Sequence, residues 1–241
     1  MIYRHLFGPV RSRRLRNSLG IDLVPDNTCS LDCVYCECGK TRNLSLRRAE
    51  YAPTDEILDE LNHFLSTDPE IDFITLGGTG EPTLHSGISS ILTSIKKEHP
   101  TYQTAVLTNS TLLHNPEVRS ELSTADLILP SLDAVTRGVF QKINRPAPGI
   151  SPEKMIQGLI DLRQEYKGQI WLEIFLIPNQ NTTEEELHLL RDAAMWIKPD
   201  RVHLNSLNRS GTEPWVAPLP DEDLMRICRF FTEKLRNVSI I

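Results

Sequence analysis

The feature that most constrains this chain is a group of cysteines between residues 27 and 41. Cys29, Cys33 and Cys36 have the spacing C-x3-C-x2-C, and four of the five cysteines of the chain lie in this stretch. Thiolates select zinc, copper(I) or iron–sulfur centres, but a structural zinc site normally takes two separated ligand pairs, and no second cysteine pair follows. Three thiolates suit an iron–sulfur cluster that leaves one iron open to a small molecule. A closed metal site or a disulfide is the alternative.

Residues 29–36, Cys-Ser-Leu-Asp-Cys-Val-Tyr-Cys, resemble the C-x3-C-x-aromatic-C signature of the radical S-adenosylmethionine (SAM) superfamily. The resemblance implies that Cys29, Cys33 and Cys36 hold a [4Fe-4S] cluster and that SAM binds its open iron through the amine and carboxylate. It also implies reductive cleavage of SAM to a 5′-deoxyadenosyl radical. Tyr35 would then lie beside the adenine or the cluster, although it can equally serve to pack the loop.

A second motif, Gly-Gly-Thr-Gly-Glu-Pro-Thr at residues 77–83, follows a predicted strand. Glycines in such a turn let the backbone approach a ligand closely. The motif resembles the Gly-Gly-Glu-Pro element of the same superfamily, which implies that the backbone around Gly78, Thr79, Gly80 and Glu81 receives the amine of SAM. Because Thr79 departs from that element, the carbonyl that meets the amine stays open. An ordinary strand-to-helix turn is the alternative.

Polar residues at the ends of later predicted strands complete the candidate site. By the same resemblance, Asn109 and Ser110 contact the SAM carboxylate or ribose, while Ser131 and Asp133 serve the ribose or the substrate. Glu173, in an otherwise apolar strand, is expected to point into a barrel. Each has an alternative role as a helix cap, a turn residue or a solvated edge. Four more residues are expected to line the substrate entrance: Asn205, Ser206, Asn208 and Arg209.

The two remaining thiols receive other roles. Cys38 is expected to stay free near the cluster, because using it as a fourth ligand would strain the loop and close the open iron. Cys228 belongs to an apolar stripe of the last predicted helix and is expected in the core. No residue is assigned a catalytic role.

The apolar pattern predicts an α/β fold in which strands alternate with amphipathic helices. Such alternation favours a parallel sheet with right-handed crossovers, either a partial barrel or an open doubly wound sheet. The superfamily resemblance implies a partial (β/α)6 barrel with parallel strands, and the cluster loop follows strand 1. Thr54 and Thr183 are predicted to cap two of the helices. The strands are predicted over 18–24, 72–76, 104–107, 126–129, 169–177 and 201–205.

Length and composition set the remaining bounds. The 241 residues fit a single radical SAM core domain over 1–241, with a short basic N-terminal extension and a C-terminal helix. No apolar run approaches the length of a membrane span, and the N-terminus carries no pattern of a secretory signal. Clustered cysteines without a dispersed disulfide pattern suit a reducing compartment, so a cytoplasmic location and no membrane partner are expected.

The charge of the chain is uneven. Residues 1–50 hold nine Lys and Arg against five acidic residues, whereas the whole chain has a net charge of −6. This basic segment flanks the cysteine loop and is expected to attract an anionic substrate, an RNA or an acidic electron donor such as flavodoxin or ferredoxin. A solvated face is the alternative.

The sequence therefore predicts a radical SAM enzyme that abstracts hydrogen from an unidentified substrate, with RNA modification as one candidate. Short motifs, such as residues 80–83 and 144–146, resemble a small branch related to wyosine synthases. Those enzymes carry additional cysteines for a second cluster, and Cys38 and Cys228 cannot supply three ligands. A glycyl-radical-enzyme activase is the alternative within the enzymes, and a non-catalytic iron–sulfur or zinc protein is the alternative outside them.

Overall fold

The structure is a computed structural model that describes residues 3–241. Met1 and Ile2 lie outside the described residues, so the expectations for the domain span 1–241 and for the N-terminus can be compared with the structure only from Tyr3 onward. No helix in residues 3–241 has the length and apolar character needed to cross a membrane.

An eight-stranded sheet with the order β1-β2-β5-β6-β7-β8-β9-β10 forms the centre of the molecule. Each predicted strand overlaps one of its six inner strands, which are mutually parallel. The sheet is not closed, so the predicted partial barrel with parallel strands is confirmed. The inner strands are β2 (Arg16–Ile21), β5 (Phe73–Leu76), β6 (Gln103–Thr108), β7 (Leu127–Pro130), β8 (Gln169–Phe175) and β9 (Arg201–Asn205).

Both edge strands were missed from the sequence. β1 (Leu6–Ser12) pairs antiparallel with β2, and β10 (Val238–Ile240) pairs parallel with β9. Much of the short basic N-terminal extension is therefore a strand of the sheet, over Leu6–Ser12. Five consecutive residues of β1 are exposed, so the strand lacks the alternation of buried and exposed residues that marks a half-buried strand.

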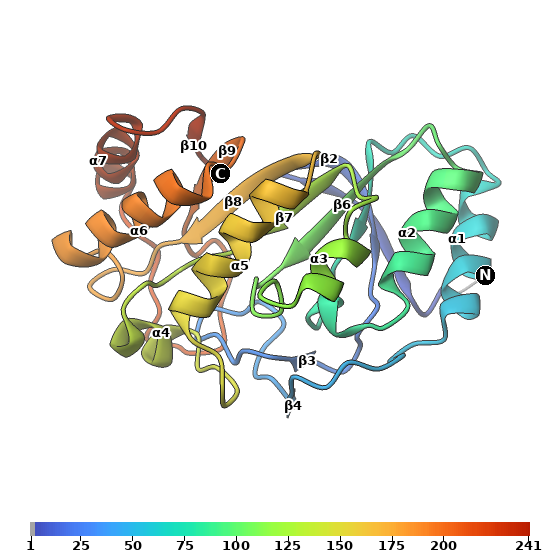
Figure 1. Ribbon diagram of the computed structural model, residues 1–241, viewed down its shortest axis with the longest axis horizontal. Coiled ribbons are helices and arrows are strands. Elements are labelled where there is room, and N and C mark those ends of the chain that lie inside the picture. Colours follow the sequence, from blue (N-terminus) through green and yellow to red (C-terminus); the bar gives the residue numbers. More distant parts are fainter. Residues whose placement is uncertain (1–2) are drawn as a thin grey trace.

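Helices cover one face of the sheet (Figure 1). Thr183 caps its helix as predicted, because its side chain accepts a hydrogen bond from the backbone N–H of Glu186. The predicted Thr54 cap is wrong: Thr54 is the first helical residue, and its N–H donates to the Glu50 carboxylate at 2.9 Å. The helices are α1 (Thr54–Leu65), α2 (Ile88–Glu98), α3 (Pro116–Glu121), α4 (Arg137–Ile143), α5 (Pro152–Glu165), α6 (Glu184–Ile197) and α7 (Asp221–Thr232).

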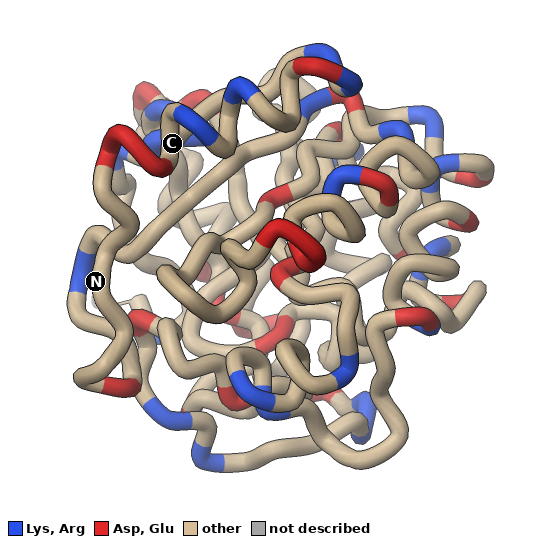
Figure 2. The backbone as a smooth tube through the Cα atoms, turned by 90° about the vertical axis from the view of Figure 1, so that its left-hand side faces the viewer, with Lys and Arg blue, Asp and Glu red and all other residues tan. Residues whose placement is uncertain are grey.

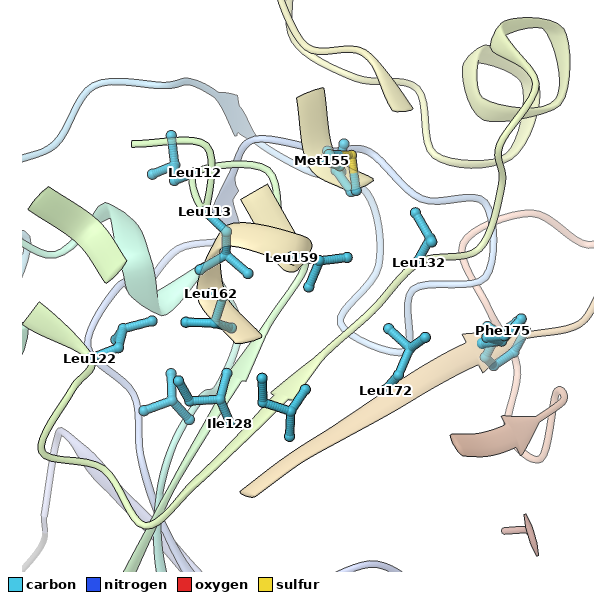
Figure 3. Packing of buried hydrophobic residues seen from close by; sticks show 14 of the residues in the cluster. Leu112, Leu113, Leu122, Ile128, Leu132, Met155, Leu159, Leu162, Leu172 and Phe175 are labelled. Carbon is cyan, nitrogen blue, oxygen red and sulfur yellow. The ribbon is translucent and has the colours of Figure 1, made fainter. Parts of the chain in front are cut away.

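The main core lies between these helices and the sheet. In Figure 3, Leu159 and Leu162 of α5 lie among Leu113, Ile128 and Leu172, and all five side chains are buried. The opposite face of the sheet, here called the inner face, carries a smaller apolar cluster of Leu15, Ala105, Leu127 and Leu129. Because side chains alternate along a strand, the residues between the core positions face this inner side.

Two short elements hold the segment between β2 and α1. β3 (Thr28–Cys29) and β4 (Asn43–Leu44) form a two-stranded pair. Elsewhere, between β5 and α2, a 3₁₀ turn spans Pro82–Leu84. The cysteine loop thus follows the C-terminal end of β2, as predicted. Acidic and basic residues are interspersed on the side of the molecule that holds α4, α6 and α7 (Figure 2).

Candidate active site

The cysteine loop brings three half-buried thiols to the C-terminal edge of the parallel strands. All five cysteines are free, so the disulfide alternative is wrong. Among residues 3–241, no three His, Cys, Asp or Glu side chains are arranged to hold one metal ion. The thiolates of a [4Fe-4S] cluster bind different irons and are spread around the cluster. The loop therefore fits a cluster better than a single ion.

Two asparagine side chains contact the cysteine sulfurs. The Asn109 amide nitrogen lies 3.3 Å from Cys29 Sγ, and the Asn144 amide nitrogen lies 3.4 Å from Cys33 Sγ. The Asn109 amide also donates to Ser30 Oγ at 2.9 Å, which fixes its orientation. Hydrogen bonds to cluster sulfurs stabilise the reduced, more negative state and tune the reduction potential.

The thiols of the loop differ in how readily they ionise. Burial raises the pKa of Cys29 to about 12 and raises the pKa of Cys33 well above its usual value. A hydrogen bond with Cys38 lowers the pKa of Cys36 to about 7 and raises the pKa of Cys38. Because metal ligation requires thiolates, a metal held by Cys29 and Cys33 would have to offset the cost of ionising two buried thiols.

Cys38 lies in the same loop, and its thiol is hydrogen-bonded to that of Cys36. Its side chain is exposed, and its Sγ lies 3.6 Å from the carbonyl oxygen of Gly78. Cys228 is half-buried and packs against the main core from α7.

The second motif, residues 77–83 and here called the glycine loop, is packed closely against neighbouring backbone and side chains. A Cβ atom on Gly78 would overlap the Asp22 side chain, and one on Gly80 would overlap the carbonyl oxygens of Val24 and Thr28. The Thr79 hydroxyl donates to Asp22 Oδ2 at 2.9 Å. Glycine is therefore required here because backbone and side chains approach where a side chain would stand.

Glu81 joins the glycine loop to the end of β6. Its buried carboxylate accepts hydrogen bonds from the Thr83 and Thr108 hydroxyls, both at 2.6 Å, and from the Asn109 N–H at 2.8 Å. Burial raises the pKa of Glu81, while these donors oppose the shift. The buried side chain of Glu81 is thus occupied within the protein, and the exposed Thr79 hydroxyl donates its proton to the hydrogen bond with Asp22.

Tyr35, which is part of the cysteine loop, belongs to a cluster of hydrogen-bonded side chains. Its ring stacks on Phe175 with centroids 4.0 Å apart, and its hydroxyl donates to Asp133. Asp133 also accepts from the Asn144 amide and from the Phe175 N–H, both at 2.9 Å. Burial raises the pKa of Asp133 to about 6. The carboxylate of Asp133, predicted to serve the ribose or the substrate, already has three protein donors.

Ser110 and Ser131 meet at the ends of β6 and β7. The Ser110 hydroxyl donates to the Ser131 carbonyl oxygen at 2.7 Å, so Ser110 ties two strand ends together. Ser131 is half-buried, and its backbone bridges to Glu173 on β8. Of these two serines, Ser131 is the one whose side chain is left for a ligand.

A cavity of about 640 Å³ opens on the inner face beside the glycine loop. Gly77 and Gly78 form one side of it, and Asn205, Asn208 and Arg209, the residues expected to line a substrate entrance, form another. Ser206 was wrongly included in that prediction. Its buried hydroxyl donates to the Leu176 carbonyl oxygen at 3.1 Å and accepts from the Leu219 N–H at 2.8 Å, so it holds the following loop.

Glu173 points to the inner face, as predicted, and forms a two-pronged ion pair with Arg14. Asn205 donates to the same carboxylate at 3.1 Å. Sequence reasoning did not assign Arg13, Arg14 or Asn144 to the site. Arg13 and Arg14 entered through the basic segment of residues 1–50 and Asn144 through a short motif, and nothing in their spacing indicates contact with the cysteine loop or with β8.

Comparison with known proteins gives the class of this site. Residues 23–192 match the radical SAM superfamily. The chain is 41% identical over 205 residues to a UPF0026 protein of Synechocystis, covering 85% of this chain and 76% of that protein. It is 31% identical over 229 residues to a UPF0026 protein of Methanocaldococcus jannaschii, covering 94% and 71%.

Another relative is longer. A protein of Brachyspira hyodysenteriae named GTPase Obg is 40% identical over 228 residues, which is 95% of this chain but 33% of that protein. The chain therefore spans about a third of this relative's length.

Solved structures share the fold at low sequence identity. Streptococcus suis SuiB bound to S-adenosylmethionine is 16% identical with a TM-score of 0.67, covering 92% of this chain and 50% of that one. A structure of TYW1 with a lysine-pyruvate adduct is 14% identical with a TM-score of 0.67, covering 91% and 75%.

The chain belongs to the radical SAM superfamily and, within it, groups with the UPF0026 proteins. Members of the superfamily are enzymes that bind a [4Fe-4S] cluster and SAM. This membership confirms the predicted family, enzyme class and cofactors.

Proposed function

We propose that Cys29, Cys33 and Cys36 hold a [4Fe-4S] cluster and that the enzyme abstracts a hydrogen atom from a substrate bound in the inner-face cavity. When bound, the cluster and SAM supply the reductive cleavage that yields the 5′-deoxyadenosyl radical. The observation that carries the proposal is the placement of three thiols and a tightly packed glycine loop at one strand edge, beside a cavity of about 640 Å³.

The residues around the thiols orient and polarise the site. Asn109 and Asn144 direct N–H groups at two of the sulfurs. Glu81 holds the backbone of the glycine loop against β6, which leaves that backbone in a fixed position to receive the amine of SAM. Ser131 is the residue proposed to contact the ribose. Such fixed dipoles need no reorganisation when the reaction occurs.

The segment after β9 covers the cysteine loop from outside. The Glu213 N–H donates to the Val34 carbonyl oxygen at 2.9 Å, and the Thr212 hydroxyl donates to the Cys36 carbonyl oxygen at 3.2 Å. Gly211 packs on the backbone of Tyr35. This cover limits access of water and oxygen to the site, which protects reactive intermediates.

The electron donor and the cellular compartment are part of the same proposal. A cluster that must be reduced requires a donor such as flavodoxin or ferredoxin and a reducing compartment, for which the cytoplasm is proposed. RNA modification stays a candidate because of the short motifs that resemble wyosine synthases, such as residues 80–83 and 144–146. The activase alternative has only a fold likeness to a domain of a pyruvate-formate lyase-activating enzyme, at 18% identity and a TM-score of 0.55.

The test is anaerobic reconstitution with iron and sulfide, followed by dithionite reduction with SAM. We expect release of 5′-deoxyadenosine, measured by chromatography, and a change in the electron paramagnetic resonance spectrum of the reduced cluster when SAM is added. Cys33→Ala should abolish both, because one iron loses its ligand. Cys38→Ala is the matched control, since Cys38 is exposed and outside the proposed ligand set.

Equal loss of 5′-deoxyadenosine in the two variants would contradict the ligand assignment. A reconstituted cluster whose electron paramagnetic resonance spectrum does not change when SAM is added would contradict the proposal as a whole.

A further inference from the structure

The wall of the inner-face cavity carries an excess of positive charge. Four of its lining residues are arginines and one is a carboxylate, Glu37. Two of the arginines are neutralised by partners: Arg14 by Glu173, and Arg209 by Glu37 at 3.4 Å. Arg11 and Arg13 form no ion pair within residues 3–241.

Arg13 is oriented by groups that leave its charge intact. Its Nη2 donates to Asn205 Oδ1 at 3.3 Å, and the Asn208 side-chain oxygen accepts from the same guanidinium when the amide is turned to face it. Both acceptors are neutral amides. A guanidinium that is held in place but not neutralised is suited to bind an oxyanion through its remaining N–H donors.

The position of Arg13 relates this charge to the reaction. The cavity that it lines also includes Gly77 and Gly78 of the glycine loop. Apolar side chains, Phe7 and Leu107 among them, complete the wall. A molecule in this space would have its anionic group at the arginines and its apolar part near the cofactor loop. The volume of about 640 Å³ falls in the range of small-molecule sites.

We propose that the substrate is a small molecule with a carboxylate or phosphate group, which Arg13 binds and Arg11 attracts. This inference rests on the proposed function, because it names the substrate class for that site. A small anion is favoured over RNA because the exposed guanidinium of Arg13 is fixed by Asn205 and Asn208 at the edge of a cavity of about 640 Å³, which has the size of a small-molecule site.

The experiment uses the arginine reagent phenylglyoxal on the full chain, with and without a reconstituted cluster, and measures modification of individual arginines by peptide mass spectrometry. Inorganic phosphate and succinate serve as separate probes for the two kinds of oxyanion. We expect one of them to slow modification of Arg13. Arg47, an exposed arginine outside the cavity, is the internal control and should react at an unchanged rate.

Variants give a second measurement by calorimetric titration of the effective anion. Arg13→Gln should weaken its binding about tenfold, since a hydrogen bond to a charged group is lost, whereas Arg47→Gln should bind as the wild type does. The inference is overturned if neither anion protects Arg13, if Arg47 is protected equally, or if a single-stranded oligonucleotide protects Arg13 while both small anions fail.

Protection of Arg13 does not depend on SAM cleavage. Protection without release of 5′-deoxyadenosine would support the anion site and contradict the proposed function. Release of 5′-deoxyadenosine without protection would support the proposed function and overturn this inference.

Discussion

At the scale of single residues, Asn144 links the cluster loop to the sheet. Its amide nitrogen contacts Cys33 Sγ at 3.4 Å, the Tyr35 hydroxyl at 3.4 Å and the Asp133 carboxylate at 2.9 Å. Asp133 is in turn bound to the backbone of Phe175. A displacement of β8 would therefore move Asp133 and Asn144, and with them the contact to Cys33 Sγ. The position of the cysteine loop thus depends on the packing of the sheet.

His85 gives a prediction for the pH dependence of stability. The buried ring lies with Nε2 2.8 Å from the Ala52 carbonyl oxygen, and Nδ1 accepts from the Gly87 N–H at 3.0 Å. This arrangement requires the neutral form, and burial lowers the pKa of His85 below 6.5. The unfolded chain then binds the proton more tightly, so the free energy of unfolding should fall as pH drops below about 6.5, by up to about 1.4 kcal/mol per unit.

Urea denaturation of the wild type and of His85→Gln between about pH 5 and about pH 8, a range that brackets the ordinary histidine pKa, checks this. The variant should be less stable near neutral pH because it cannot make both hydrogen bonds, and its stability should decline less on acidification. Parallel pH curves for the two proteins would contradict the role given to His85.

The cluster cysteines could be proposed from the sequence because their spacing is local. Asn109 was also found, because it directly follows a strand and strand ends meet at one edge of a parallel sheet. Arg13 and Asn144 could not be assigned, because their partners lie far along the chain: Arg13 contacts Asn205, and Asn144 contacts Cys33. Such contacts are set by how β1 and α4 pack, which periodicity does not reveal.

At the scale of elements, the buried strands and long amphipathic helices were predictable because one face of each is apolar. α4 (Arg137–Ile143) was missed, since it has seven residues and only Phe140 and Ile143 are buried. β10 has three residues and is mostly exposed. Short or exposed elements are stabilised by tertiary contacts rather than by their own sequence pattern.

The glycine loop supplies a prediction at this scale. Gly80→Ala should destabilise the protein by about 1 to 3 kcal/mol, because the added methyl group overlaps two backbone carbonyl oxygens that cannot move independently. Gly138→Ala in α4 is the matched control. A Cβ there meets no atom within 4 Å, and alanine is the better helix former, so stability should rise by up to about 1 kcal/mol.

Chemical denaturation with circular dichroism detection measures both changes. Equal effects of the two substitutions would mean that the loop adjusts to a side chain at residue 80, and that the close packing of Gly80 is not required for the fold.

At the scale of the whole molecule, the N-terminal segment completes the inner face of an unclosed sheet. After β1, Leu15 is buried against Ala105, Leu127 and Leu129 of the parallel strands. The chain thus crosses the inner side of the sheet before β2 begins. One edge of the cavity is consequently built from residues 7–15, far in sequence from the other edge at Asn205 to Arg209.

The Arg14–Glu173 pair fixes this arrangement across the inner face. The side chains are 20% and 14% exposed, and two guanidinium nitrogens contact the carboxylate. Removing one partner leaves a nearly buried charge unpaired, which costs about 3 to 5 kcal/mol in a fully buried pair and less with this residual solvent contact. Glu173→Leu or Arg14→Met alone should therefore lower the free energy of unfolding by about 2 kcal/mol.

A double variant distinguishes the effect of the ion pair from the effect of side-chain packing. Arg14→Met with Glu173→Leu removes both charges and replaces them with apolar side chains of similar length, so it should be more stable than either single variant. Urea denaturation of the four proteins gives the coupling free energy. If the two single losses simply add, the pair does not stabilise the fold as a unit, and the N-terminal segment must be held to the sheet by Leu15 and the β1–β2 pairing instead.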